Sequence, residues 1–160
     1  MFLSLSLHSQ PTSGEPATGD SGFAFYLLRD STVATYQILN VPIDSLRLAL
    51  VPLFTAQDIK SYSWSTHTFV LKPKSDSIFK NICSIRRKSR DVPFVINVGN
   101  ERIYVGEFNS PLSSLSPPWT YIIGSTSPYK LCYPGLARLP DMRSDKRIHD
   151  ALQAAGVLVD

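Results

Sequence analysis

The chain has 160 residues, of which 43% are hydrophobic, and its 16 basic and 13 acidic side chains leave a formal net charge of +3. This length allows one domain with its own core, and the hydrophobic fraction is that of a globular protein, not of a disordered one. So small a net charge does not by itself indicate a nucleic-acid-binding protein. Two cysteines are too few for a structural zinc site, so no metal or other cofactor is predicted; Cys83 and Cys132 could form a disulfide or remain buried thiols.

The N-terminal stretch differs in composition from the rest of the chain. It begins with MFLSLSL, which is a poor complete signal peptide but could be the end of one, and continues with a segment rich in Ser, Pro, Thr and Gly. Such a segment buries too little apolar surface to offset the entropy lost on ordering. We therefore predict a flexible tether over residues 1–21 and a single domain over 22–160; an ordinary ragged N-terminus is the alternative. No apolar run reaches the roughly 18 residues of a membrane span. The sequence leaves open a lipid anchor, or a signal peptide that is missing from this chain.

The first part of the domain contains two predicted strands and a helical turn. The apolar run 23–28 predicts a buried strand, and the alternating leucines of 43–52 predict another. The segment between them, residues 31–40, fits either a short helix or a loop. Thr55 and Asp58 resemble a capping box, so one helical turn is expected there.

A strand is expected near residues 66–71, and the clearest helix of the chain follows at about 75–88. Ile78, Ile82 and Ile85 recur on one side of this helix, so we expect that stripe to pack on the sheet. The basic residues at its end suit the last turn of a helix, where the dipole favours cations.

A hairpin is predicted next, with strands over 93–98 and 102–108. Its two-residue loop, Gly99-Asn100, has glycine first, as a type II′ turn requires. Counting outward from this loop leaves one face almost wholly apolar. The predicted pairs are Val98 with Glu101, Asn97 with Arg102, Ile96 with Ile103, Val95 with Tyr104, and Phe94 with Val105.

The end of the chain predicts a strand over 119–124 and a helix over 144–156. Ser144 can cap this helix, and Gly156 stands where a terminating glycine belongs. Because strands and helices do not alternate in the βαβ manner, we predict an α+β fold. It should have a mostly antiparallel sheet, one amphipathic helix at about 75–88 packed on it, and a short C-terminal helix.

Motifs for common catalytic chemistries are absent, among them phosphate-binding, dinucleotide-binding, zinc-protease and serine-hydrolase sequences. His8 lies in the predicted tether, so a histidine-based mechanism would need His67 or His149. His67 shares a strand face with Phe69 and Leu71. We therefore expect a mostly buried His67, with a ring nitrogen hydrogen-bonded inside the protein, that seats its strand and does not catalyse.

Polar and aromatic side chains gather after the predicted hairpin. Gly106 interrupts a strand, which indicates a bulge or a close approach of backbone. The residues that follow could form the rim of a pocket, or a serine-rich turn whose hydroxyls cap its own backbone. They are Glu107, Phe108, Asn109, Ser110, Ser113, Ser114 and Trp119.

Three stretches resemble, in this order, a family of uncharacterised bacterial proteins that are often exported or lipid-anchored: DIKSYSWSTHTFVL, PFVINVGNERIYVGEFNSPLSS and PDMRSDKRIHDALQAAG. The family motif D-I-x-x-Y-x-W-x-x-H falls here on Asp58, Ile59, Tyr62, Trp64 and His67. A hairpin motif Y-x-G falls on Tyr104 and Gly106. Before the terminal helix, Met142 stands where the family has proline. The resemblance covers most of residues 22–156. It implies an extracytoplasmic location and no known activity, and it makes Tyr62, Trp64 and His67 one unit, either a packing cluster or a binding rim.

These observations favour a non-catalytic extracytoplasmic domain that binds a protein, a cell-surface polymer or a small molecule. One alternative is a hydrolase that uses His67 with Glu107 or Asp58 and a serine of the loop after the hairpin. A second alternative, nucleic-acid or anionic-surface binding through the basic run 86–90, is weakened by the lack of a second basic cluster. No catalytic residue or metal ligand is predicted. The predicted ligand-binding residues are His67, Tyr62, Trp64, Tyr104, Glu107, Asn109 and Ser114.

Overall fold

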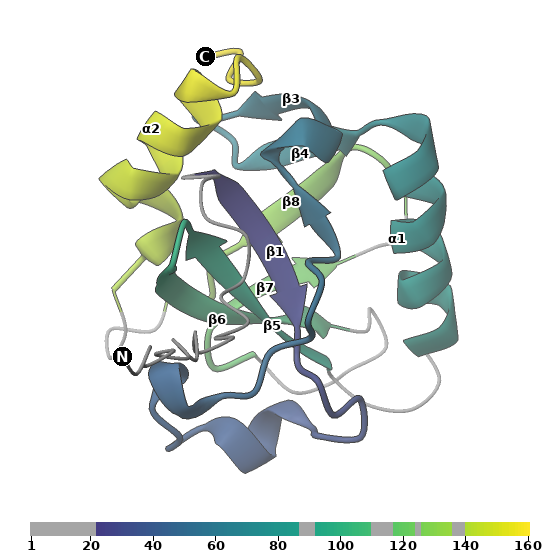
Figure 1. Ribbon diagram of the computed structural model, residues 1–160, viewed down its shortest axis with the longest axis vertical. Coiled ribbons are helices and arrows are strands. Elements are labelled where there is room, and N and C mark those ends of the chain that lie inside the picture. Colours follow the sequence, from purple (N-terminus) through teal and green to yellow (C-terminus); the bar gives the residue numbers. More distant parts are fainter. Residues whose placement is uncertain (1–21, 87–91, 110–116, 124–125, 136–139) are drawn as a thin grey trace, which may run out of the picture.

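The computed structural model describes residues 22–86, 92–109, 117–123, 126–135 and 140–160. Its strands are β1 Phe23–Leu27, β2 Phe54–Thr55, β3 Ile59–Ser63, β4 Thr68–Leu71, β5 Val92–Val98, β6 Glu101–Asn109, β7 Thr120–Ile123 and β8 Tyr129–Cys132. The α-helices are α1 Pro73–Arg86 and α2 Lys146–Ala154 (Figure 1). Short 3-10 helices are η1 Thr35–Ile38, η2 Ile43–Ser45, η3 Ala56–Asp58 and η4 Met142–Ser144.

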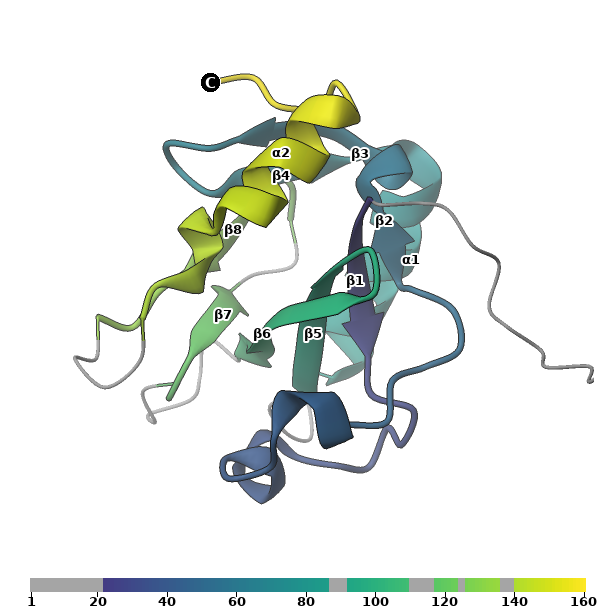
Figure 2. The same cartoon turned by 60° about the vertical axis from the view of Figure 1, so that its left-hand side comes forward.

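The strands form one sheet in the order β2-β1-β5-β6-β7-β8-β4-β3. Every neighbouring pair is antiparallel except β6 and β7, which run parallel. The α+β class with a mostly antiparallel sheet is therefore confirmed. The sheet curls so far that its two edge strands, β2 and β3, are joined by the single turn η3 (Figure 2). Among the described residues, no helix is long and apolar enough to cross a membrane.

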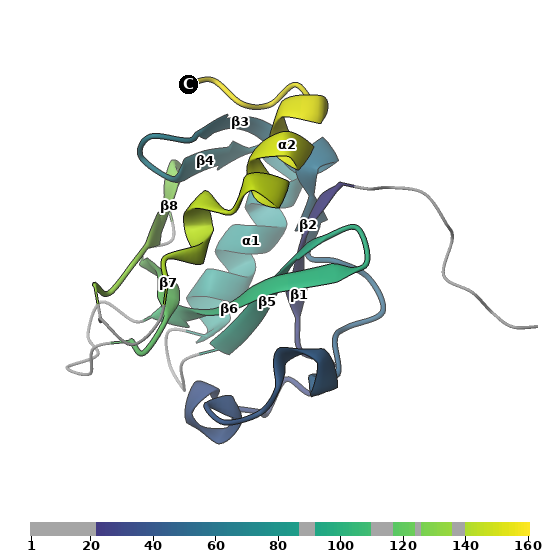
Figure 3. The ribbon, with the colours of Figure 1, turned by 90° about the vertical axis from the view of Figure 1, so that its left-hand side faces the viewer.

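The main core is aromatic and lies within the curled sheet. Phenylalanine rings from five strands meet there, with the Phe25 and Phe94 centroids 4.2 Å apart. Both helices contribute, because Phe79 of α1 and Leu152 of α2 are fully buried in the same cluster. Figure 3 shows the two helices with the strands that they cover. The core therefore ties both helices to the sheet, whereas the sequence predicted such packing for α1 alone.

A second, smaller core covers the outer face of β5 and β6. The chain between β1 and β2 lies over this face and buries Leu46 against Val95. Residues 31–40, for which the sequence left a short helix or a loop open, contain the short 3-10 helix η1. The strand predicted over 43–52 is wrong: the segment contains η2, its one bridge joins Leu48 to Leu28, just after β1, and Leu50 is 86% exposed. Alternation predicts a strand only where a neighbouring strand can pair along it, and here one apolar side chain enters the core while another faces solvent.

Helix α1 is present but turns a different face to the core than predicted. It begins at Pro73, a residue suited to a first helical position. Phe79 and Ser75, one turn apart, are buried, whereas Ile78 is 46% exposed. The Ser75 hydroxyl donates to Asp58 Oδ1 at 2.7 Å, and this bond anchors the face that the isoleucine pattern did not indicate. The side chain of Ile85 lies outside the described residues.

The hairpin has the predicted loop but not the whole predicted register. Gly99 has φ 57°, and Val98 pairs with Glu101 and Asn97 with Arg102, as expected. A β-bulge then adds one residue to β6, so Ile96 pairs with Tyr104 and Phe94 with Gly106. The bulge places the Tyr104 side chain, rather than that of Val105, on the core face. The predicted pairs beyond the bulge are therefore wrong by one residue.

The C-terminal helix ends at the predicted glycine, and its N-cap lies one residue later than predicted. Gly156 has φ 69°, and the amide of Val157 donates to the Leu152 carbonyl at 3.2 Å, as in a glycine-terminated helix. The N-cap is Asp145, whose carboxylate accepts from the Arg147 amide; Ser144 belongs to the preceding turn. Strands β3 and β8 were not predicted.

Candidate functional site

His67 lies in the connection between β3 and β4, one residue before β4 begins. Its backbone is left-handed, with φ 51°, and the residue is only 8% exposed. Nδ1 lies 3.4 Å from the Tyr62 hydroxyl, and Nε2 lies 3.4 Å from the Ser144 hydroxyl. Both distances are long for hydrogen bonds. The expectation that His67 is mostly buried, with a ring nitrogen bonded inside the protein, is confirmed. The expectation that it shares a strand face with Phe69 and Leu71 is wrong, because β4 begins only at Thr68 and His67 belongs to the turn before it.

The structure brings Tyr62, Trp64 and His67 together. The Trp64 ring lies 6.2 Å from the Tyr62 ring and 5.5 Å from the imidazole, and its other neighbour is His149 at 5.0 Å. The carboxylate of Asp160 holds the turn that carries these residues. It accepts hydrogen bonds from the amides of Trp64 and Ser65 and from the hydroxyls of Ser63 and Ser65.

The surroundings of His67 favour the neutral form of its imidazole. Burial lowers the pKa of His67, and the positive charge of Arg143 lowers it further. The guanidinium of Arg143 is itself bound by Asp141, to whose two carboxylate oxygens its Nε and Nη2 donate at 2.8 and 2.7 Å. Its Nη1 donates to the Leu131 carbonyl at 2.8 Å. The nearest ion pair is therefore satisfied internally, and no described carboxylate is hydrogen-bonded to His67.

The carboxylates considered for a hydrolase are engaged elsewhere. Asp58 caps η3, accepting from Thr55, and also binds the Ser75 hydroxyl. Glu107 is 3% exposed and accepts from the indole nitrogen of Trp119 at 3.2 Å. The serines proposed as nucleophiles, at 110, 113 and 114, lie outside the described residues. Within the described part of the chain, nothing orients His67 as the base of a serine-histidine-carboxylate triad.

Tyr104 extends this polar group toward the middle of β6. It is 7% exposed, and burial raises the pKa of its phenol, with a smaller contribution from the neighbouring Tyr62. No hydrogen bond joins the Tyr104 hydroxyl to another described residue.

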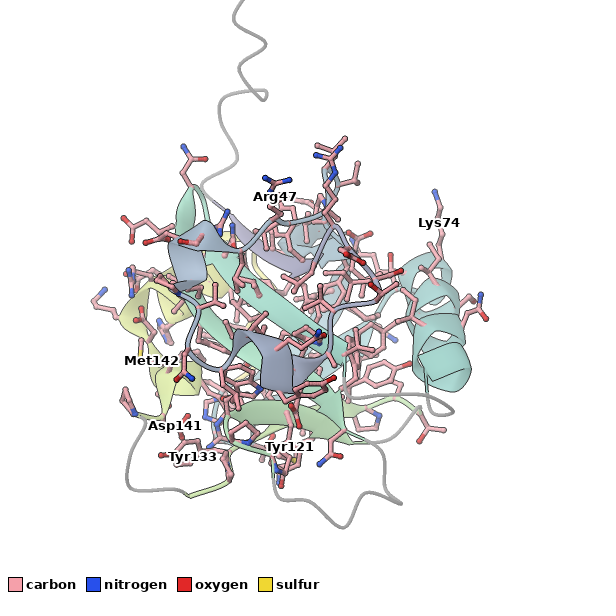
Figure 4. All side chains as sticks on the ribbon, turned by 90° about the horizontal axis from the view of Figure 1, so that it is seen from below. Arg47, Lys74, Tyr121, Tyr133, Asp141 and Met142 are labelled. Atoms are coloured by element: carbon pink, nitrogen blue, oxygen red, sulfur yellow. The ribbon has the colours of Figure 1, made fainter. Side chains whose placement is uncertain are left out.

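A cavity of about 290 Å³ adjoins Tyr104 where β6 separates from β7. Its walls are mostly apolar and include three aromatic rings. Figure 4 shows Tyr133 and Met142 on the same side of the molecule, next to Asp141. The residues around the cavity are Ile43, Ile103, Tyr104, Val105, Trp119, Thr120, Tyr133, Pro140 and Met142.

Two of the three rings are held by charged neighbours outside the cavity. The bond from the Trp119 indole to the buried Glu107 fixes the position of that ring. The Arg143 guanidinium carbon lies 5.6 Å from the centre of the Tyr133 ring, and Arg143 is in turn bound to Asp141. Rings held in this way form a preorganised wall, so a ligand need not order them on binding.

The predicted site residues fall into three places. Tyr104 lines the cavity, and the Tyr62, Trp64 and His67 group lies beyond it on the side of η4. Glu107 supports Trp119 from behind, and Asn109 ends β6 with its side-chain oxygen buried and without a hydrogen-bond partner among the described residues. Ser114 lies outside the described residues.

Sequence reasoning missed most of the cavity walls. Ile43, Tyr133 and Met142 come from three separate segments, and only the fold brings them to one place. Trp119 had been singled out as part of the polar loop. The inward position of the Tyr104 side chain had no signal in the sequence, because it depends on the bulge in β6.

Comparison of the chain with protein-family models, with curated proteins and with solved structures gives no match. What the chain binds is therefore inferred from the cavity and its surroundings.

Proposed function

We propose that this protein is a non-catalytic binding domain whose ligand places a small apolar or aromatic group in the cavity beside β6. The observation that carries the proposal is a preformed cavity with three aromatic rings in its wall, those of Tyr104, Trp119 and Tyr133. Ligand sites are typically concave and apolar, with few polar groups that set orientation. At about 290 Å³ this cavity is at the small end of such sites and suits one ring or one branched side chain.

The chemistry of the cavity walls further limits the class of ligand that could bind. None of the described lining residues is charged, so a charged group would lose its hydration without gaining an ionic partner. Three rings can instead stack on, or meet edge-on, a planar group. We expect the hydroxyl of Tyr104, which has no hydrogen bond to another described residue, to offer the ligand one hydrogen bond. A ligand with one ring and one polar atom should therefore bind better than the same ring without that atom.

In the test, the intact protein is titrated with p-cresol, indole or toluene. Binding is monitored by NMR chemical-shift changes and by the melting temperature. Saturating ligand should raise stability by mass action, about 2.7 kcal/mol at a hundredfold excess over the dissociation constant. Trp119→Ala should abolish binding. Tyr104→Phe should remove the preference for p-cresol over toluene. Tyr36→Ala, at a residue 65% exposed and away from the cavity, is the matched control.

Two results would contradict this function. One is the absence of any shift at the cavity residues with all three compounds. The other is hydrolysis of a simple ester by the protein that His67→Ala abolishes, since that result would favour the hydrolase.

An extracytoplasmic location belongs to the same proposal. It is supported by the apolar start of the chain and by the resemblance to exported bacterial proteins. Fractionation of cells that express the whole coding sequence tests it. Recovery only with the cytosolic fraction would overturn the location and leave the cavity proposal unaffected.

A further inference from the structure

A short protrusion interrupts the pairing between β1 and the chain that precedes β2. The amide of Ala49 donates to the Leu27 carbonyl at 2.9 Å. The amide of Leu53 donates to the Phe25 carbonyl at 2.7 Å. The acceptors are two positions apart, whereas the donors are four positions apart, so two extra residues loop out of the antiparallel pairing between fixed ends. Figure 2 shows this segment bowing away from β1 just before β2.

The protrusion carries two adjacent aliphatic side chains into solvent. Leu50 is 86% exposed and Val51 is 72% exposed, and neither packs in the two cores. Single exposed apolar residues are ordinary on protein surfaces. Here, however, two of them stand together on a loop whose ends are hydrogen-bonded to β1. The fold therefore holds this apolar pair away from its own cores.

Two arginines oppose each other at the base of the protrusion. The bridge between Leu28 and Leu48 is antiparallel, and next to it the Arg29 amide donates to the Arg47 carbonyl at 2.8 Å. Both arginines are exposed, and no described carboxylate forms a hydrogen bond or ion pair with either guanidinium. The neighbouring Asp30 accepts hydrogen bonds within its own turn. Like charges directly opposite each other are destabilising, so this pair suits a negatively charged group placed between them.

We propose that this protrusion docks the protein on a membrane that contains anionic phospholipid. Leu50 and Val51 enter the boundary between headgroups and acyl chains, and Arg29 and Arg47 bind lipid phosphates above them. The spacing fits, because Arg47 and Leu50 are three residues apart, which is at most about 10 Å at about 3.3 Å per residue. Side chains that bind at this boundary enter it by about 5–10 Å.

A lipid surface explains the two features better than a protein partner does. It supplies an apolar phase for the aliphatic tip and a layer of phosphates for the cations at its base. A specific protein interface ordinarily buries about 1,000 Å² or more in total, which a tip of two apolar side chains does not provide. The contact also leaves the cavity free, since Figure 4 shows Arg47 on the other side of the molecule from Tyr133, Asp141 and Met142. The inference therefore goes beyond the proposed function and does not depend on it.

The experiment is sedimentation of the full chain with vesicles of phosphatidylcholine alone, or of phosphatidylcholine and phosphatidylglycerol in equal parts. We expect binding to the mixed vesicles, weaker binding to phosphatidylcholine, and a decrease as salt screens the headgroup charge. No binding to the mixed vesicles at low salt, or equal binding to both kinds of vesicle, would overturn the inference. Competition by inorganic phosphate beyond its effect on ionic strength would identify a site for a free anion, and would overturn it as well.

One pair of substitutions tests the apolar tip. Leu50→Ser combined with Val51→Ser should weaken binding to the mixed vesicles about tenfold or more, because apolar burial is lost. Val159→Ser, at an aliphatic residue that is 64% exposed elsewhere, is the matched control. Melting curves confirm that each variant is folded. Self-association of the parent that the tip pair abolishes would identify a second copy as the occupant and overturn the inference.

A second pair of substitutions tests the cations. Arg29→Gln combined with Arg47→Gln should weaken binding about tenfold or more. Lys60→Gln combined with Lys130→Gln removes the same charge from exposed residues outside the protrusion and should have a smaller effect. Equal losses in the arginine and lysine pairs would reduce the contact to net charge and overturn the inference. Binding that survives both the tip and the arginine substitutions would belong to another surface, such as the basic run 86–90, with the same consequence.

Discussion

The ring of Phe94 packs directly on the backbone of Gly106, in the space that a side chain at position 106 would need. A β-carbon there would lie 2.2 Å from Phe94 Cζ and 2.7 Å from the carbonyl oxygen of Thr120. These contacts join β5, β6 and β7 at the point where the parallel ladder begins. The close backbone approach that the sequence indicated at Gly106 is thus confirmed.

Gly106→Ala should destabilise the protein by about 3 kcal/mol or more, because overpacking of this core strains both a ring and a backbone carbonyl. Chemical denaturation measures the loss. Phe94→Leu in the same chain should recover part of it, since the smaller side chain relieves the ring contact but not the contact with Thr120. A Gly106→Ala variant as stable as the parent would contradict the packing described here.

The left-handed backbone of His67 predicts that substitution by asparagine destabilises the protein less than substitution by alanine. His67→Ala should cost on the order of 1–3 kcal/mol, from lost packing and from the unpaired hydroxyls of Tyr62 and Ser144. His67→Asn should cost about 1 kcal/mol less than His67→Ala, because asparagine tolerates φ 51° better than alanine does. Urea denaturation of the two variants provides the comparison. Equal losses would mean that the backbone at this turn relaxes freely.

Stability should fall as the pH is lowered through the range in which histidine titrates. The pKa of His67 in the folded protein is lowered from its ordinary 6.5, first by burial and then by Arg143. Between these two pKa values the unfolded chain binds more protons than the folded one, so stability is complete above about 6.5 and declines as the pH falls toward the folded pKa. Denaturation at several pH values measures this slope. His67→Asn should flatten it, and an unchanged slope in that variant would assign the effect to another group.

The carboxylate of Asp160 should control local opening of the β3 edge more than global stability. Four donors of the Ser63–Ser65 turn converge on it, and these bonds lower its pKa. Asp160→Asn should therefore speed hydrogen exchange of the Tyr62 and Val159 amides, which pair the chain after α2 with β3. The melting temperature should change little, because the side chain lies at the surface. Glu101→Gln, at another exposed carboxylate, is the matched control, and equal exchange in the two variants would count against this role.

Local sequence was sufficient where a signal is complete within a few residues. The apolar run at 23–27, the capping pair Thr55 and Asp58, the glycine-first loop at Gly99 and the terminating glycine at Gly156 all have the predicted structure. In each case the information is a turn residue, a cap or a short apolar run, whose energetics depend mainly on near neighbours. The α+β class follows from the order of such elements.

Other features depend on contacts between segments that are distant in sequence and pack in the same core. Helix α1 buries Ser75 and Phe79 instead of Ile78, because the carboxylate of Asp58 and an aromatic cluster face that side. Strand β8 forms because β4 and β7 offer edges on both sides of it. Neither choice can be read from a local pattern, since a helix or strand with several apolar positions has more than one face that it could bury.

The cavity also depends on such contacts, because its walls come from segments that are distant in sequence. Sequence alone predicted the α+β class and the hairpin with its glycine-first loop, and it drew attention to Tyr104 and Trp119. Tertiary structure decided that a bulge turns Tyr104 inward, that β7 leaves β6 at Gly106, and that Tyr133 and Met142 close the space between them. The physical reason is that turns and caps are set by neighbours along the chain, whereas strand register and cavities are set by the packing of segments brought together only by the fold.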